Sequence, residues 1–124
     1  MVTAQPIPIS GAPDPAAERL DRVFFALSDP VRRAILGRLD QGPLLVSEIA
    51  APFEISLQAV SRHIQVLVRA GLVSQARTGR ISRCSLDAEP LSEAAAWINH
   101  YAKYWQGQFE ALAQRLIAIE KEKP

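Results

Sequence analysis

The sequence predicts a mainly α-helical fold with a small β-hairpin, in the order α-α-α-α-β-β-α. Over most of the chain, apolar residues recur at steps of three and four, a spacing typical of amphipathic helices. Residues 72–77 and 81–86 form two short runs that predict strands, and Gly79 between them favours a tight hairpin turn. A length of 124 residues and an apolar content of 48% fit one globular domain with a modest core.

The chain is expected to begin with a flexible arm. Residues 1–13 hold three prolines and a glycine without any periodicity. Residues 14–122 are expected to form a single domain, because helical and strand patterns follow one another there without a linker.

Two Asp-Pro pairs mark the starts of the first two helices. Asp is a favoured N-cap and Pro is a favoured first helical residue. The pair at 14–15 predicts a helix over residues 14–28, and the pair at 29–30 predicts a helix that ends at residues 41–43.

A short helix and a longer one follow. The short helix is expected after Ser47, and Pro52 keeps it brief. The longer helix should run over residues 57–70, with Ser56 as its N-cap and Gly71 directly after its end. Its apolar face is expected to pack against the core and consists of Leu57, Val60, Ile64 and Leu67.

The last element is expected to be one long helix over residues 90–122. If helical throughout, it would reach roughly 50 Å at ~1.5 Å per residue. Gly107 lies inside it and indicates either a bend or a close approach of a partner helix.

Charge is distributed unevenly along the chain. From Ile55 to Leu86 there are five arginines and no Asp or Glu, so this segment carries +5. The rest of the chain sums to −4, because the formal net charge of the whole is +1. An acid-free segment of this kind is suited to a polyanion, since a carboxylate facing phosphates would repel them.

The order of elements is that of a winged helix-turn-helix, in which one helix enters the DNA major groove and the hairpin contacts the backbone or minor groove. The helix over 57–70 turns its polar side outward, and its N-terminus favours phosphate. We therefore predict double-stranded DNA as the partner. The expected DNA-binding residues are Ser56, Gln58, Ser61, Arg62, Gln65, Arg69, Arg77, Thr78, Arg80 and Arg83.

Three segments resemble the ArsR family of bacterial winged-helix repressors. They are Val60-Ser61-Arg62-His63, then Ala70-Gly71-Leu72-Val73 before the basic hairpin, and the earlier stretch from Ala26 to Leu36. The resemblance covers about residues 20–86. It implies a homodimer that binds a partly palindromic operator and blocks transcription. It also implies base-reading and phosphate-contacting positions in the helix at Gln58, Ala59, Ser61, Arg62 and His63, with Arg80 at the tip of the wing.

The chain departs from the metal-sensing members of that family. Where those members carry a Cys-x-Cys pair, this chain has Leu45 and Ser47, so the thiolate ligands are missing. His100 in the last helix has no histidine partner, and Cys84 is expected to be a packed strand thiol. We therefore expect no metal site and no cofactor.

Most of the aromatic residues lie on the first and last helices, whose outer sides one winged helix cannot bury. We expect dimerisation through the helices over 14–28 and 90–122. A small apolar effector pocket between those helices is the alternative. The expected interface residues are Leu20, Phe24, Phe25, Trp97, Ile98, Tyr101, Tyr104, Trp105, Phe109, Leu112 and Leu116.

The sequence predicts a dimeric, sequence-specific transcriptional regulator, most simply a cytoplasmic repressor. The alternative function is a protein-interaction module that kept the fold without specific DNA binding. A Gly-rich phosphate loop, a nucleophile elbow and an HExxH motif are all missing from the sequence, so we expect no enzyme. No segment has the pattern of a membrane span or a signal peptide.

Overall fold

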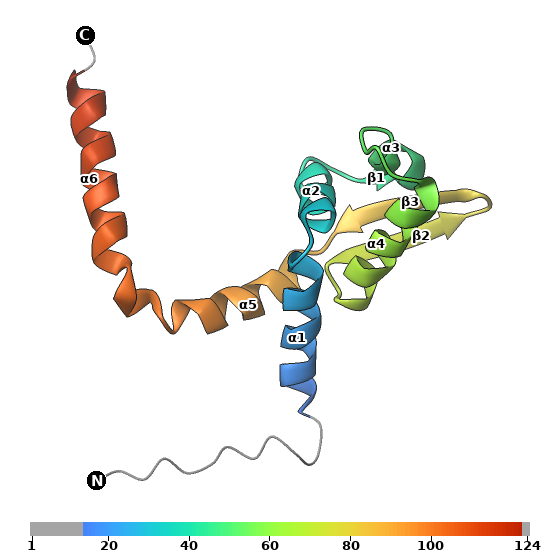
Figure 1. Ribbon diagram of the computed structural model, residues 1–124, viewed down its shortest axis with the longest axis horizontal. Helices are drawn as coiled ribbons and strands as arrows, with labels where there is room; N and C mark the ends of the chain where they lie inside the picture. The colour runs from blue at the N-terminus through green and yellow to red at the C-terminus, as the bar shows by residue number, and fades with distance from the viewer. Residues whose placement is uncertain (1–13, 123–124) are drawn as a thin grey trace.

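The computed structural model describes residues 14–122, and the expected N-terminal arm over 1–13 lies outside the described residues. In Figure 1 the N-terminal helices and the hairpin form one body, from which the C-terminal helices extend. In chain order the elements are α1 (Pro15–Leu27), α2 (Pro30–Leu39), β1 (Leu44–Leu45), α3 (Val46–Ala50), α4 (Leu57–Arg69), β2 (Val73–Thr78), β3 (Ile81–Leu86), α5 (Glu89–Asn99), a 3-10 helix (Ala102–Tyr104) and α6 (Gln106–Glu122).

Side-chain caps fix the starts of three helices. Asp14 accepts a hydrogen bond from the backbone of Ala16, and Asp29 caps α2 in the same way. The hydroxyl of Ser56 accepts from the backbone N–H of Ala59 at 3.0 Å and so caps α4. These caps satisfy N–H groups that have no partner within the helix, and they confirm the starts predicted from the sequence.

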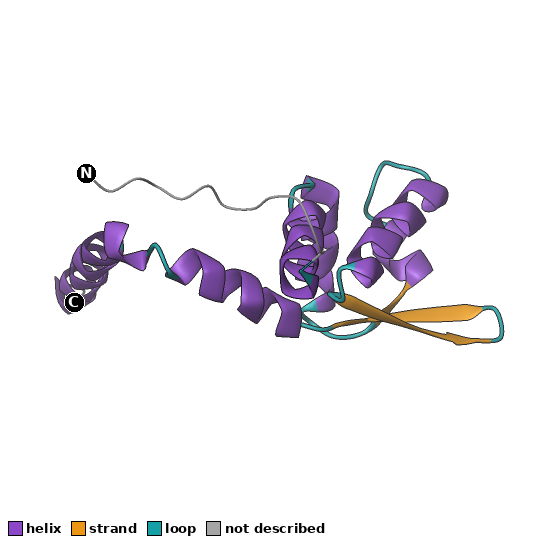
Figure 2. Cartoon of the chain, turned by 90° about the horizontal axis from the view of Figure 1, so that it is seen from below, coloured by secondary structure: helices purple, strands orange, loops and turns teal. Residues whose placement is uncertain are grey.

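The β-sheet has three strands rather than the expected two. Its order is β1-β3-β2, and β1 pairs with β3 through Leu44 opposite Cys84 and Leu45 opposite Arg83. The short helix α3 begins directly after β1, one residue before Ser47, and the carboxylate of Glu48 accepts from the backbone N–H of Leu45. The hairpin of β2 and β3 projects past the helices (Figure 2).

The core lies between α1, α2, α4 and the base of the sheet. Val23, Ile35, Leu67 and Cys84 are fully buried there. Leu57 was expected on the same face of α4 but is 56% exposed. It stands at the first turn of α4, where the helix extends past the core beside the hairpin, so no core residue covers it.

The last helix is broken, in contrast to the single helix expected over 90–122. The N–H groups of Tyr101, Tyr104 and Trp105 bond to carbonyls three residues back, which replaces α-helical bonding with a 3-10 turn. Five of the seven residues from Asn99 through Trp105 are of types with weak helix propensity, the exceptions being Ala102 and Lys103, so this segment is a weak part of the helix. The direction therefore changes just before Gly107, and α6 extends away from the body (Figure 1).

Candidate nucleic-acid interface

The helix α4 separates an apolar face from a polar one. Val60, Ile64 and Leu67 are buried, whereas Gln58 and Arg62 are exposed on the other side. Burial of the apolar face orients the helix, so its polar side chains must point outward. The acid-free stretch noted in the sequence thus becomes an outward-facing polar helix surface.

Hydrogen bonds join this helix to the wing. Gln65 donates to the side-chain oxygen of Gln75 on β2 at 3.0 Å, and Gln75 donates in turn to the hydroxyl of Ser82 on β3. The hollow between helix and hairpin brings together four of the predicted DNA-binding residues and is lined by Val46, Leu57, Ser61, Gln65, Gln75, Arg77, Arg80 and Ser82. Sequence reasoning missed Gln75 and Ser82, because neither carries charge or belongs to a recognisable motif.

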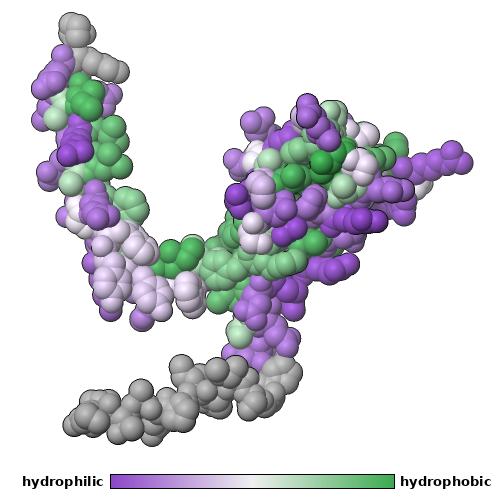
Figure 3. Space-filling view, viewed as in Figure 1, coloured by the Kyte–Doolittle hydropathy of each residue, from purple (hydrophilic) through white to green (hydrophobic). Residues whose placement is uncertain are grey.

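The three arginines of the wing do not share one face of the hairpin. Arg77 pairs with Ser82, but Arg83 pairs with Ala76. Successive strand residues point to opposite faces, so Arg77 faces α4 and Arg83 faces away from it. Arg80 lies in the two-residue turn, next to Gly79 whose φ is +61°. Figure 3 shows the hairpin tip as strongly hydrophilic.

The predicted DNA-binding residue His63 contacts side chains of its own chain. Its Nδ1 lies 3.3 Å from Nη1 of Arg32 and 3.9 Å from the carboxylate of Asp29. Arg32 is buried. It donates to the carbonyls of Phe25 and Ala26 at 2.8 Å each, so it ties the end of α1 to α4.

The carboxyl of Asp29 is stabilised in its charged form. Burial opposes its ionisation, but hydrogen bonds from the backbone N–H groups of Arg32 and Val31, together with nearby His63 and Arg32, outweigh burial. The pKa of Asp29 therefore lies below its ordinary value of 3.8. Asp29 thus caps α2 and lies next to His63 at the junction of α1 and α2.

Arg69 lies at the far end of α4 from the predicted reading residues. It lines a different hollow with Arg19 and Arg22 of α1 and with acidic residues at the start of α5. The structure therefore separates Arg69 from the group around Ser61 and Arg77.

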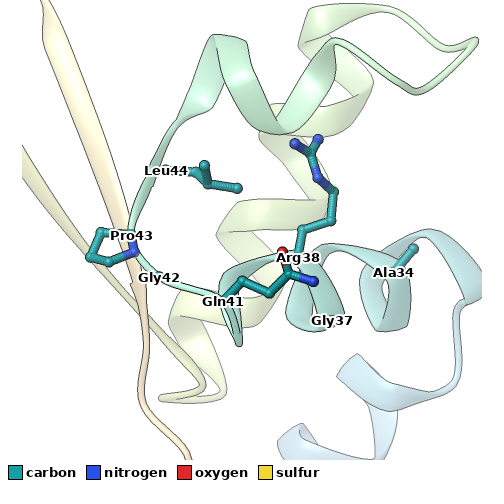
Figure 4. Close-up of a pocket in the computed structure, with 7 residues that line it drawn as sticks. All are labelled: Ala34, Gly37, Arg38, Gln41, Gly42, Pro43 and Leu44. Atoms are coloured by element: carbon teal, nitrogen blue, oxygen red, sulfur yellow. The ribbon is translucent and has the colours of Figure 1, made fainter.

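Other features of the described residues bear on competing functions. A hollow at the end of α2 is lined by no predicted DNA-binding residue (Figure 4), and Arg38 there donates to the carbonyls of Glu48 and Ile49.

Burial raises the pKa of the Cys84 thiol, so the thiolate is disfavoured. Within residues 14–122 no group of three His, Cys, Asp or Glu side chains could hold a metal ion. No helix in that range is long and apolar enough to cross a membrane.

Known proteins share this architecture. A family model described as a helix-turn-helix domain matches residues 27–76, the span from the end of α1 to the middle of β2. The transcriptional repressor SdpR of Bacillus subtilis is 34% identical over 82 residues, which cover 66% of this chain and 91% of that protein. A solved structure described as an ArsR family transcriptional regulator is 39% identical, with a TM-score of 0.68, and the match covers 73% of this chain and 93% of that one. The chain belongs to the ArsR family.

A second solved structure is the homodimeric winged helix-turn-helix DNA-binding domain of Mb0332 from Mycobacterium bovis. It is 26% identical with a TM-score of 0.56, and the match covers 79% of this chain and 95% of that one. The ArsR-family chain is a DNA-binding transcriptional regulator with a winged helix-turn-helix fold, which confirms the fold and the general function predicted from the sequence.

Proposed function

We propose that this protein is a homodimeric repressor that binds a partly palindromic operator with α4 in the major groove and the hairpin on the flanking backbone. The observation that carries the proposal is the acid-free surface in which the polar face of α4 is joined to the wing by the bonds from Gln65 through Gln75 to Ser82. That linkage fixes the distance between helix and wing, so both can meet one duplex in a defined register.

Base reading belongs to the outward side of α4. Gln, Ser and Arg side chains can pair with base edges in the major groove, and Gln58, Ser61, Arg62 and Gln65 have those chemistries. Ala59 is half-buried beside them and offers an apolar contact. Ser56 caps the helix whose N-terminus favours phosphate.

Phosphate contacts belong to the wing. Arg77 on the helix-facing side, with Arg80 and Thr78 at the tip, is suited to the backbone or minor groove. Arg83 lies on the opposite face of the hairpin, so it can contact only a phosphate that lies on that outer side. We assign His63 to holding α4 in place and Arg69 to the rear of that helix, away from the bases.

Dimerisation is proposed through α1 and the C-terminal helices. Phe24 packs edge-on against Trp97, with the two ring centroids 5.6 Å apart, and this contact joins α1 to α5 within one chain. Tyr101 packs against Trp97. Phe25, Ile98 and Tyr101 remain exposed on these two helices or next to them, and we propose that a second copy covers them. The relative Mb0332 is described as homodimeric, which supports the same assembly here. The proposed interface extends through Leu20, Tyr104, Trp105, Phe109, Leu112 and Leu116.

Selection from a random duplex library at near-physiological salt tests the function. We expect enrichment of an inverted repeat whose half-sites lie about one helical turn apart. Retention without sequence enrichment would contradict specific reading and leave only electrostatic binding. No retention would favour the interaction module, which keeps the fold without DNA binding.

The proposal includes no catalytic activity and no metal or other cofactor. Saturable quenching of tryptophan fluorescence by a small apolar molecule would instead identify an effector site near Trp97 and Trp105.

A further inference from the structure

Leu57 is an apolar side chain on the outward, polar side of α4, where it is 56% exposed. Steps of four residues place Leu57, Ser61 and Gln65 in one row along the helix, and all three line the hollow between α4 and the hairpin. Leu57 is the first residue of α4, so it lies at the N-terminal end of this row. The side of the helix that faces the wing therefore begins with an apolar group and continues with polar ones.

A second hollow extends the apolar surface around Leu57. Val46 and Leu57 line both hollows, and Ile81, which is also 56% exposed, lines the second one. Single apolar side chains scattered over a surface need no explanation. Here the starts of α3, α4 and β3 contribute apolar residues to one place, which indicates a surface that another molecule covers.

The charges around Leu57 indicate what kind of molecule that is. Arg80 lines both hollows and Arg77 lines the first, while no Asp or Glu of the described residues lines either one. A duplex matches this combination, because its phosphates can pair with the arginines while its major groove presents one apolar group, the C5 methyl of thymine. An apolar protein segment would leave both arginines without a counter-charge.

We propose that Leu57 is a specificity-determining residue that contacts the C5 methyl group of a thymine in each operator half-site. The contact rests on the proposed function, in which α4 enters the major groove. It removes apolar surface of both the leucine and the methyl group from water, whereas an unmethylated cytosine offers no such group. Arg77 and Arg80 contact the phosphates nearby, which fixes the register of the helix without reading sequence.

Replacement of each thymine of the selected operator by deoxyuridine, one position at a time, tests the contact with the full chain. Uracil pairs as thymine does and lacks only the C5 methyl group. At one thymine of a half-site, loss of the methyl should weaken binding about three- to fivefold, the effect expected for one buried group of this size. Fluorescence anisotropy gives the ratio of the Kd values for the uracil and thymine duplexes.

Three variants identify the side chain that contacts the methyl group. In Leu57→Ala the ratio at that thymine should fall to about one, because the shortened side chain no longer reaches the methyl. In Leu57→Met, which keeps a long apolar side chain, the ratio should stay above about two. Arg80→Ala is the matched control from the same hollow and should weaken both duplexes equally, which leaves the parental ratio unchanged. A purely structural role of Leu57 would not change this ratio at one thymine alone.

Each other outcome overturns the contact in a distinguishable way. If uracil weakens binding equally in the parent and in Leu57→Ala, another residue such as Ala59 contacts the methyl. If an operator is enriched but none of its thymines is sensitive to uracil, the proposed function stands and the contact is wrong. If only 5-methylation of a cytosine strengthens binding, methylcytosine is the ligand and not thymine. If no operator is enriched, the proposed function fails and the contact fails with it.

Discussion

At the scale of single residues, Arg62 and Arg80 are both exposed arginines, but they stand on elements with different proposed tasks. Arg62 lies on the proposed reading face of α4. Arg62→Ala should therefore weaken binding to the selected operator by about 1–3 kcal/mol and leave binding to nonspecific duplexes little changed. Arg80→Ala should weaken binding to all duplexes. It should also lower the slope of the logarithm of the binding constant against the logarithm of the salt concentration by about one unit, as for a lost phosphate contact. Fluorescence anisotropy at several salt concentrations measures both. Parental binding by both variants would refute the assignment of helix and wing.

Substitutions of the neighbours Arg32 and Arg33 are expected to differ sharply in their effect on the free energy of unfolding. Arg32 is buried and bonds to Phe25, Ala26 and His63, so Arg32→Ala should lower the free energy of unfolding by about 2–3 kcal/mol. Arg33 is exposed, and Arg33→Ala should change that free energy by only about 0.5 kcal/mol.

Urea unfolding followed by circular dichroism compares the two arginine variants. Equal losses would mean that the network around Arg32 does not stabilise the corner between α1, α2 and α4.

At the scale of elements, two glycines should respond oppositely to the same substitution. Gly71 ends α4 with φ +76°, and a Cβ there would lie 3.4 Å from Pro90, so Gly71→Ala should cost about 1–2 kcal/mol. Gly107 is helical with open space around it, so Gly107→Ala should stabilise by about 0.5–1 kcal/mol. Thermal melts of both variants measure the difference. A Gly107→Ala variant that melts earlier would show that a partner helix approaches this position.

The order of most elements could be predicted because their boundaries carry local signals. Asp14, Asp29 and Ser56 are side-chain caps, and Gly79 supplies the positive φ of the hairpin turn. The two-residue strand β1 could not be predicted, because two leucines show no periodicity and their pairing depends on distant Cys84.

The break after α5 was equally hidden. Apolar spacing continues across it, and weak helix propensity alone rarely stops a helix. The burial of Arg32 and the contact of His63 with it also depend on residues far apart in sequence. The acid-free stretch predicts the proposed DNA-binding surface as a whole, and this remains a prediction, whereas the separation of Arg83 from Arg77 required the strand register.

At the scale of the whole molecule, specific binding should depend on the dimer. One winged helix offers one reading helix and reaches only one half-site, while a two-fold pair places two reading helices on the same duplex. Ile98 is 43% exposed on α5, lies beside the aromatic cluster and belongs to no proposed DNA contact. Ile98→Glu places a charge in the proposed interface, which should give a monomeric mass in light scattering at micromolar concentration.

The same variant should bind the selected inverted repeat no better than a single half-site, a loss of at least about a hundredfold if the two half-sites act together. Gln41→Glu, with the same added charge on an exposed turn, is the control and should remain dimeric. Circular dichroism should show equal helix content in both variants, because the side chain of Ile98 is not part of the core. A monomeric Ile98→Glu protein that keeps full affinity for the inverted repeat would show that each subunit reads DNA on its own, and the proposed two-fold mode of binding would be wrong.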